Sequence, residues 1–273
     1  MFSMKKFFGL LVIAAVFLAC NNNTPDQPID TSNNNPAAPI ISYTVVKEHP
    51  HDTSFFTEGL EFYKGQLFES SGGNNDGTNH PSAFGIVDKS TGKVSIKATL
   101  DRAKYFGEGI TIFNNKIYQL TWTNEKGFIY DATTFKLIKE FSYKGQGWGL
   151  THDSTRLIMS DGSSNIKFLD PETLQVLNIM GVSDNNGPVG NLNELALAGA
   201  YLYANQWQSN LIYKIELPSG KVVGRIDLDN LARQAQQRFS GANELNGIAY
   251  NEATNTFLIT GKNWPIFFEL KLN

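Results

Sequence analysis

The chain has 273 residues and a net charge of −3, from 23 Lys and Arg residues against 26 Asp and Glu residues. No basic run follows the first few residues, so we expect no nucleic-acid partner. One cysteine, Cys20, excludes an intramolecular disulfide, and the four histidines lack metal-ligand spacing, so zinc chemistry is not expected.

The first forty residues have the composition of a leader and a linker. A basic pair precedes the apolar stretch 7–19, and Val16–Cys20 resembles a bacterial lipoprotein box. We therefore predict that residues 1–19 are a lipoprotein signal peptide and that Cys20 is lipidated; the alternative is ordinary secretion, with Cys20 removed or inert. Residues 20–40, rich in Asn and Pro, predict a disordered tether. The expected location is the bacterial cell envelope, facing the periplasm, with the lipid anchor as the only membrane contact.

Residues 41–273 contain five repeats of short strands, separated by turns rich in Gly, Asn and Asp. The first repeat predicts strands at Gly59–Phe62 and Gln66–Ser70, a third ending at Val87-Asp88, and a fourth at Val94–Leu100. Repeats of about 40–50 residues with several short strands are typical of a β-propeller. We therefore predict an all-β fold, a five-bladed β-propeller.

The fifth repeat is incomplete, with strands near 247–250, 256–260 and 266–272 before the chain stops. Its missing outer strand can come from Ser42–Lys47 at the start of the domain. Such a strand would close the ring and remove an open sheet edge. Residues 231–239 predict a short helix inserted between the fourth and fifth blades.

A short phrase recurs once in each repeat, at the turn into the first strand. Its five copies are Thr57-Glu58-Gly59-Leu60, Gly107-Glu108-Gly109-Ile110, Gly147-Trp148-Gly149-Leu150, Leu192-Asn193-Glu194-Leu195 and Leu245-Asn246-Gly247-Ile248. Equivalent positions of all blades converge on the axis of a propeller. We call the second position of this phrase the key slot. The residues at this position are therefore expected to lie together: Glu58, Glu108, Trp148, Asn193 and Asn246.

A second set of equivalent positions follows the second strand of each repeat: Gly72, Trp122, Gly162, Trp207 and Lys262. We expect the tryptophans and the lysine of this set at the same mouth of the channel as Trp148. The alternative for any single tryptophan is packing between blades. Indole walls disfavour an ionised carboxylate, which would make Glu108 a proton carrier near neutral pH. Asn193 and Lys262 have the chemistry to hold a carbonyl oxygen and stabilise charge on it.

These motifs closely resemble those of plant-type (papaya-type) glutaminyl-peptide cyclotransferases and their bacterial relatives. The resemblance covers nearly all of residues 42–272 and rests on Phe56–Leu60, Tyr105–Gly109, Tyr118–Trp122, Gly147–Leu150, Leu192–Leu195 and Thr260–Pro265. It implies a five-bladed propeller enzyme that converts an N-terminal glutamine of a peptide or protein into pyroglutamate and releases ammonia. The animal enzymes of this activity are zinc-dependent and have a different fold.

The resemblance also implies roles for site residues. Glu108 would be the general acid and base, and the aromatic pocket would consist of Phe106, Trp122, Trp148 and Trp207. Asn193 and Lys262 would be the polar groups beside it, and Phe56 and Glu58 would complete the substrate-binding set. No cofactor would be required, no metal ligand set is expected, and we expect a monomer.

Glu58 departs from the resemblance, because the family usually carries Gln at this place. A second carboxylate in the channel would raise the pKa of Glu108 by like-charge repulsion, or would recruit a structural cation. Two other functions stay open from the sequence. One is a non-enzymatic periplasmic propeller that binds a peptide or ligand. The other is a calcium-dependent propeller lactonase, for which Glu58, Glu108, Asn193 and Asn246 would supply part of the ligand cluster.

Overall fold

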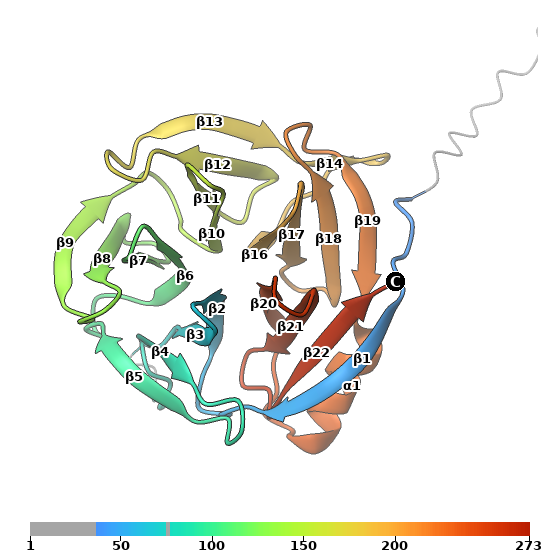
Figure 1. Cartoon of the computed structure of the whole chain (residues 1–273), viewed down its shortest axis with the longest axis horizontal. Coiled ribbons are helices and arrows are strands. Elements are labelled where there is room, and N and C mark those ends of the chain that lie inside the picture. Colours follow the sequence, from blue (N-terminus) through green and yellow to red (C-terminus); the bar gives the residue numbers. More distant parts are fainter. Residues whose placement is uncertain (1–36, 75–76) are drawn as a thin grey trace, which may run out of the picture. The chain divides into compact units, whose positions relative to one another are not determined.

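The computed structural model describes residues 37–74 and 77–273, and these form five four-stranded antiparallel sheets arranged radially around a central axis (Figure 1). The predicted signal peptide 1–19, Cys20 and most of the predicted tether lie outside the described residues, so those assignments stay predictions. Within the described ranges, no helix has the length and apolar character needed to cross a membrane.

Each of the first four blades consists of four consecutive strands, with the innermost strand first. The first blade contains β2 (Thr57–Tyr63), β3 (Gln66–Ser71), β4 (Ala83–Val87) and β5 (Val94–Thr99). The second contains β6 (Gly107–Phe113), β7 (Lys116–Thr121), β8 (Lys126–Asp131) and β9 (Leu137–Ser142). The third contains β10 (Leu150–His152), β11 (Leu157–Ser160), β12 (Asn165–Leu169) and β13 (Val176–Gly181). The fourth contains β16 (Leu192–Ala198), β17 (Tyr201–Gln206), β18 (Leu211–Glu216) and β19 (Val222–Asp227).

The fifth blade joins the two ends of the domain. It consists of β20 (Leu245–Asn251), β21 (Thr256–Gly261), β22 (Ile266–Leu272) and, outermost, β1 (Tyr43–Pro50). Strand β1 pairs antiparallel with β22, from Tyr43 opposite Leu272 to Pro50 opposite Ile266. The predicted closure of the ring by an N-terminal strand is therefore confirmed, and the closing strand runs further than the predicted Ser42–Lys47.

Two insertions interrupt the regular blades. Helix α1 (Asp229–Arg238) lies between β19 and β20, where the sequence predicted a short helix. A two-stranded hairpin, β14 (Ser183–Asp184) and β15 (Gly187–Pro188), lies between the third and fourth blades and was not predicted. The predicted all-β, five-bladed fold class is confirmed.

The described end of the predicted tether packs against the fourth blade. Ala38 is buried, Arg225 N donates to Pro39 O at 2.9 Å, and Ile41 N donates to Arg225 O at 2.8 Å. The predicted end of the disordered segment, residue 40, therefore lies too far along the chain. The last residues of this segment form backbone contacts with the outer strand β19.

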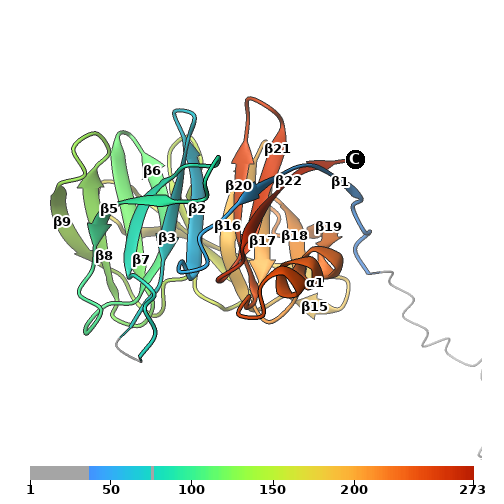
Figure 2. The ribbon, with the colours of Figure 1, turned by 90° about the horizontal axis from the view of Figure 1, so that it is seen from below.

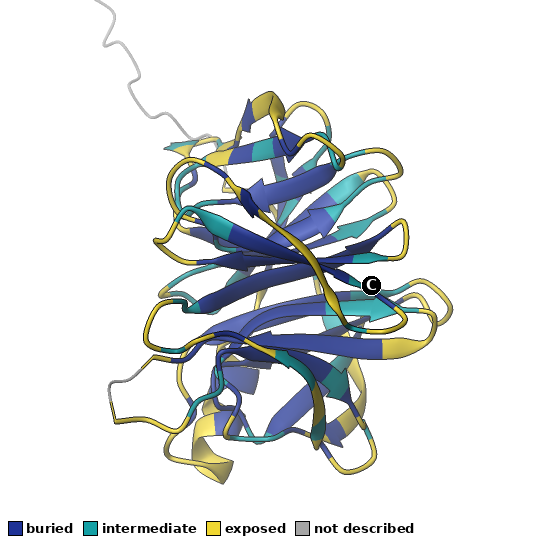
Figure 3. Ribbon diagram, turned by 90° about the vertical axis from the view of Figure 1, so that its left-hand side faces the viewer, coloured by how far each residue is buried: buried dark blue, intermediate teal, exposed yellow. Residues whose placement is uncertain are grey.

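The hydrophobic core fills the spaces between neighbouring blades, where the inner strands are buried (Figure 3). The outermost strands β1, β5, β9 and β13 are largely exposed. One cluster joins Phe68 and Phe84 of the first blade to Ile112 and Phe128 of the second. Close packing of this kind fixes each blade against the next. It thereby fixes the relative positions of the inner strands at the axis.

Four of the inner strands carry a β-bulge inside the recurring phrase. The pairing register shifts at Thr57/Gly59 in β2, Gly107/Ile110 in β6, Leu192/Leu195 in β16 and Leu245/Ile248 in β20. A bulge inserts a residue and re-aims its side chain. The side chains of Glu58, Glu108, Asn193 and Asn246 therefore leave the regular alternation of their strands near one end of the channel.

Candidate active site

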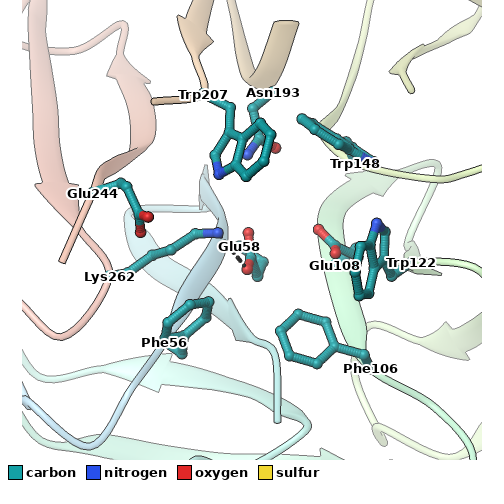
Figure 4. Close-up of a pocket in the computed structure, with 10 residues that line it drawn as sticks. All are labelled: Phe56, Glu58, Phe106, Glu108, Trp122, Trp148, Asn193, Trp207, Glu244 and Lys262. Atoms are coloured by element: carbon teal, nitrogen blue, oxygen red, sulfur yellow. Dashed lines mark ion pairs between the residues drawn. The ribbon is translucent and has the colours of Figure 1, made fainter. Parts of the chain in front are cut away.

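A cavity of about 260 Å³ lies at one end of the central channel. Figure 4 shows the ten residues that line it: Phe56, Glu58, Phe106, Glu108, Trp122, Trp148, Asn193, Trp207, Glu244 and Lys262. The nine residues assigned to the site from the sequence are all among them, and Glu244 is the addition. The structure thus brings the predicted site residues together, while their chemical roles stay predictions.

We call this cavity the catalytic cavity. At its rim, backbone hydrogen bonds join the second set of repeat positions to the residues that stand two places before the key slot. The residue after a second strand donates its N–H to the carbonyl of the segment before an inner strand. Trp122 N bonds to Phe106 O at 3.1 Å, and Lys262 N bonds to Glu244 O at 2.9 Å. The rim side chains are therefore held by regular backbone pairing and not by free loops.

Two glycines of the second set make room for aromatic rings. A Cβ atom at Gly72 would lie 2.0 Å from the ring of Phe106, and one at Gly162 would lie 2.6 Å from the ring of Trp148. Real Cβ contacts are never this short, so any larger residue at either position would displace a wall of the cavity. The alternation of glycine and tryptophan along this set follows from that packing.

The aromatic wall consists of two edge-on pairs of rings, and the side-chain amide of one residue connects the two pairs. Phe106 packs edge-on against Trp122 at 6.1 Å between ring centroids, and Trp148 packs edge-on against Trp207 at 5.5 Å. The Oε1 atom of Gln146 accepts hydrogen bonds from the indole N–H groups of both Trp122 and Trp148, each at 2.8 Å. An indole nitrogen only donates, so the oxygen of Gln146 must face both rings.

Glu58 and Lys262 form a buried ion pair inside the cavity. Glu58 Oε1 lies 2.9 Å from Lys262 Nζ, and Glu58 Oε2 accepts a hydrogen bond from Asn246 Nδ2 at 2.9 Å. The Lys262 ammonium also lies 4.6 Å from the centre of the Phe56 ring, a cation–π distance. The cation that faces Glu58 is therefore an ammonium supplied by the chain itself.

Burial and charge set the protonation of this pair. Burial raises the pKa of Glu58 to about 7, although Lys262 and Asn246 act in the opposite direction. Burial lowers the pKa of Lys262, but the carboxyl groups of Glu58 and Glu108 outweigh it, so this pKa lies above its ordinary value. The ammonium therefore stays charged at neutral pH, beside two carboxyl groups that compete to neutralise it.

Glu108 is the carboxyl group without a partner. Glu108 is 5% exposed. None of the described residues makes a hydrogen bond or ion pair with its carboxyl oxygens. Burial, followed by the charge on Glu58, raises the pKa of Glu108 well above its ordinary value, and Lys262 offsets this only in part. Ser70 Oγ donates to the Glu108 carbonyl at 2.6 Å and holds the bulge. The geometry leaves a free, protonatable carboxyl group facing the cavity.

The two asparagines of the key slot have different positions. Asn193 is buried and lines the cavity, and its Oδ1 atom has no hydrogen-bond partner among the described residues. Asn246 lies outside the cavity lining and donates to Glu58 and to the carbonyl of Thr57, at 3.0 Å for the latter. Asn246 thus orients Glu58.

Sequence reasoning missed Gln146 and Glu244. Both stand two residues before the key slot, where the first two blades carry Phe56 and Phe106 and the fourth carries Asn191. This third set of equivalent positions was the signal that would have found them. In the described residues, no three His, Cys, Asp or Glu side chains are grouped to hold a metal ion.

Comparisons with known proteins show the family and support the fold. A sequence model described as glutamine cyclotransferase matches residues 12–272. The chain belongs to the glutamine cyclotransferase family. It is 38% identical over 237 residues to the glutaminyl-peptide cyclotransferase of Arabidopsis thaliana, in a match that covers 85% of this chain and 72% of that protein.

A solved structure supports the same family. The crystal structure of Myxococcus xanthus glutaminyl cyclase matches with a TM-score of 0.76 and 30% sequence identity, covering 86% of this chain and 98% of that one. The glutamine cyclotransferase family inferred from the motifs, and the expectation that the chain is an enzyme, are therefore confirmed.

Proposed function

We propose that this chain converts the N-terminal glutamine of peptides into pyroglutamate and releases ammonia, with Glu108 as the general acid and base. The observation that carries the assignment is the unpartnered, buried carboxyl group of Glu108 in an aromatic cavity, beside the Lys262 ammonium. The names of the Arabidopsis thaliana and Myxococcus xanthus relatives support the same reaction.

The reaction is internal to the first residue of the substrate. The α-amine attacks the side-chain carboxamide carbon, a C–N bond forms, the bond to the amide nitrogen breaks, and one proton moves from the amine to the departing ammonia. An N-terminal amine has a pKa of roughly 7.7–8.0, so the neutral nucleophile is available without strong activation. The cavity of about 260 Å³ has the size to hold the folded-back side chain, and such orientation supplies several kcal/mol of the barrier.

Glu108 carries the proton between the two nitrogens. In its ionised form it accepts a proton from the attacking amine, and in its protonated form it gives that proton to the leaving group. A pKa well above the ordinary range suits both steps, because neither form is too stable near neutral pH.

Lys262 and Asn193 orient and stabilise the substrate. The ammonium donates to the carboxamide oxygen, where negative charge develops as the amine attacks. The side-chain amide of Asn193, which lines the cavity, donates its N–H to the carboxamide oxygen of the substrate. The aromatic rings of the wall exclude water and strengthen both interactions.

Ammonia release from a Gln-initiated dipeptide tests the proposal. We expect Glu108→Gln to lower kcat by roughly 10²–10⁴-fold, the usual contribution of a general acid or base, with an unchanged circular dichroism spectrum. Full activity in this variant would overturn the assignment of Glu108. The parent is assayed with and without chelator. Release that survives the chelator supports the proposal, and release lost with the chelator would implicate a metal ion. No release at all would favour the ligand-binding alternative.

A further inference from the structure

A second hollow, of about 390 Å³, adjoins the catalytic cavity. We call it the polar hollow; it is lined by Gln208, Ser209, Asn210, Ala232, Gln236, Ala242, Asn243 and Glu244. Glu244 lines both spaces, and Trp207 of the catalytic cavity is followed directly by Gln208 of the polar hollow. Helix α1, which supplies Gln236, lies on the side of the propeller away from the β2–β3 and β20–β21 turns (Figure 2).

Backbone hydrogen bonds hold the walls of the polar hollow in place. Asn243 N donates to Lys262 O at 2.8 Å and Trp264 Nε1 donates to Asn243 O at 2.9 Å, so this wall is attached to the lysine of the catalytic cavity. On the other wall, Leu228 N donates to Asn210 O at 2.9 Å, which joins the turn after β17 to the start of α1. The hollow is therefore a preformed surface.

Several polar groups of this surface are free to bind. No described residue makes a hydrogen bond with the side-chain amides of Gln208 and Gln236 or with the Glu244 carboxylate, whereas Asn210 and Asn243 are paired with Asp229 and Asn263. Amide side chains both donate and accept, which complements a peptide backbone. Glu244 is the charged residue of the lining, and Figure 4 shows its carboxylate pointing toward Lys262.

We propose that the polar hollow is a subsite for the residues that follow the N-terminal glutamine, and that it favours a basic side chain among them. The inference rests on the proposed cyclisation. That reaction is confined to the first residue, so the rest of the peptide must leave the catalytic cavity across its rim. Glu244 lies at the rim, where the catalytic cavity meets the unpartnered amides of Gln208 and Gln236 in the polar hollow. The volume of the polar hollow lies in the range of small-ligand sites, about 300–1,000 Å³.

The peptide backbone and the basic side chain use different groups of the subsite. The amides of Gln208 and Gln236 bond to the carbonyls and N–H groups of the second and third residues. The Glu244 carboxylate pairs with a lysine or arginine among them. Peptides longer than a dipeptide are therefore the better substrates.

The length dependence is tested with two adjacent glutamines of α1. Gln236 lines the polar hollow, whereas Gln237 is exposed and lines neither space. We measure kcat/KM for a Gln-initiated dipeptide and for a Gln-initiated pentapeptide with neutral residues. Gln236→Ala is expected to lower the pentapeptide-to-dipeptide ratio by roughly threefold to tenfold through KM, the loss of one neutral hydrogen bond. Gln237→Ala, with the same change in helix propensity, is expected to leave the ratio as in the parent.

The charge preference is tested with Glu244→Gln. This variant is expected to lower the ratio of kcat/KM for a lysine-containing pentapeptide over the neutral one by about twofold to fivefold, as for an exposed ion pair. Equal kcat/KM for dipeptide and pentapeptides in the parent, or equal effects of the two helix variants, would overturn the subsite while leaving the cyclisation intact. Ammonia release from none of the peptides would instead overturn the proposed function, and the subsite with it.

Discussion

The carboxyl group of Glu58 sets the charge of the catalytic cavity. It is 1% exposed, pairs with Lys262 at 2.9 Å and is oriented by Asn246. The resemblance to plant-type enzymes implies Gln at this place, which would leave the ammonium with Glu108 and Glu244. With three carboxyl groups in its lining and one ammonium, the cavity instead has more acids than one cation can neutralise. The charge on Glu58 therefore favours the protonated form of Glu108.

Replacing Glu58 by Gln is expected to shift the pH dependence of the reaction. Glu108 accepts a proton only when it is ionised, so kcat/KM rises with pH through the raised pKa of Glu108. Glu58→Gln removes the charge that raises this pKa and leaves Lys262, which lowers it. We therefore expect the rising limb of kcat/KM to move to lower pH. The measurement is a pH profile on a Gln-initiated dipeptide; an unmoved limb, or one shifted to higher pH, would contradict the coupling.

Gln146 is a positioning residue for the aromatic wall. Gln146→Ala leaves the indole N–H groups of Trp122 and Trp148 without their acceptor, so both rings lose their fixed orientation. We expect KM to rise by roughly fivefold to tenfold, as for two neutral hydrogen bonds partly replaced by water, with a smaller change in kcat. Gln146→Glu keeps acceptor oxygens and is expected to restore most of the affinity. A change in kcat alone, or no rescue by Glu, would contradict this role.

At the scale of strands, the sequence repeat was sufficient to predict the fold, but two residues at or beside the catalytic cavity were not predicted. Turn residues and alternation predicted the inner strands, because those signals are local. The incomplete fifth repeat predicted the closing strand. Gln146 and Glu244 escaped because a polar residue before a strand is ordinary, and only its equivalence to Phe56 and Phe106 in other repeats marks this position. The hairpin Ser183–Pro188 was missed for the converse reason, since it is too short to carry a periodic signal.

The bulges explain why the key slot holds such different residues. A regular strand would point alternate side chains into the two neighbouring blades, where apolar packing selects them. At the register shifts in β2, β6, β16 and β20 this constraint is lifted, and the slot accepts carboxylates and amides. The scaffold thus tolerates chemical change in the cavity without repacking the core.

At the scale of the whole molecule, one buried carboxyl group joins neighbouring blades near the axis. Glu194 of β16 is fully buried, and its Oε2 accepts a hydrogen bond from Ile248 N of β20 at 2.8 Å. The backbone N–H groups of Leu60 in β2 and Leu195 in β16 lower its pKa, and its Oε1 atom has no hydrogen-bond partner among the described residues. Figure 1 shows these three inner strands around the centre of the ring. Glu194 thereby accepts a hydrogen bond from the backbone of the next blade.

The stability that Glu194 confers is expected to depend on pH. Burial raises the pKa of Glu194 well above its ordinary value of 4.5, although the backbone hydrogen bonds oppose this. The folded state therefore holds the proton more tightly than the unfolded state. The corresponding stabilisation is fully present below pH 4.5 and is lost as the pH rises through the raised pKa.

Glu194→Gln isolates this contribution, because the amide does not titrate and still offers an acceptor oxygen. We expect the parent to lose free energy of unfolding relative to this variant as the pH rises above 4.5, by at most about 1.4 kcal/mol per pH unit. Urea unfolding of both proteins over a series of pH values measures the difference, in which other titrating groups largely cancel. Glu194→Leu, which removes the acceptor, is expected to be less stable than Glu194→Gln at every pH, by about 1–3 kcal/mol. A pH-independent difference between parent and Glu194→Gln would show that Glu194 titrates alike in the folded and unfolded chain.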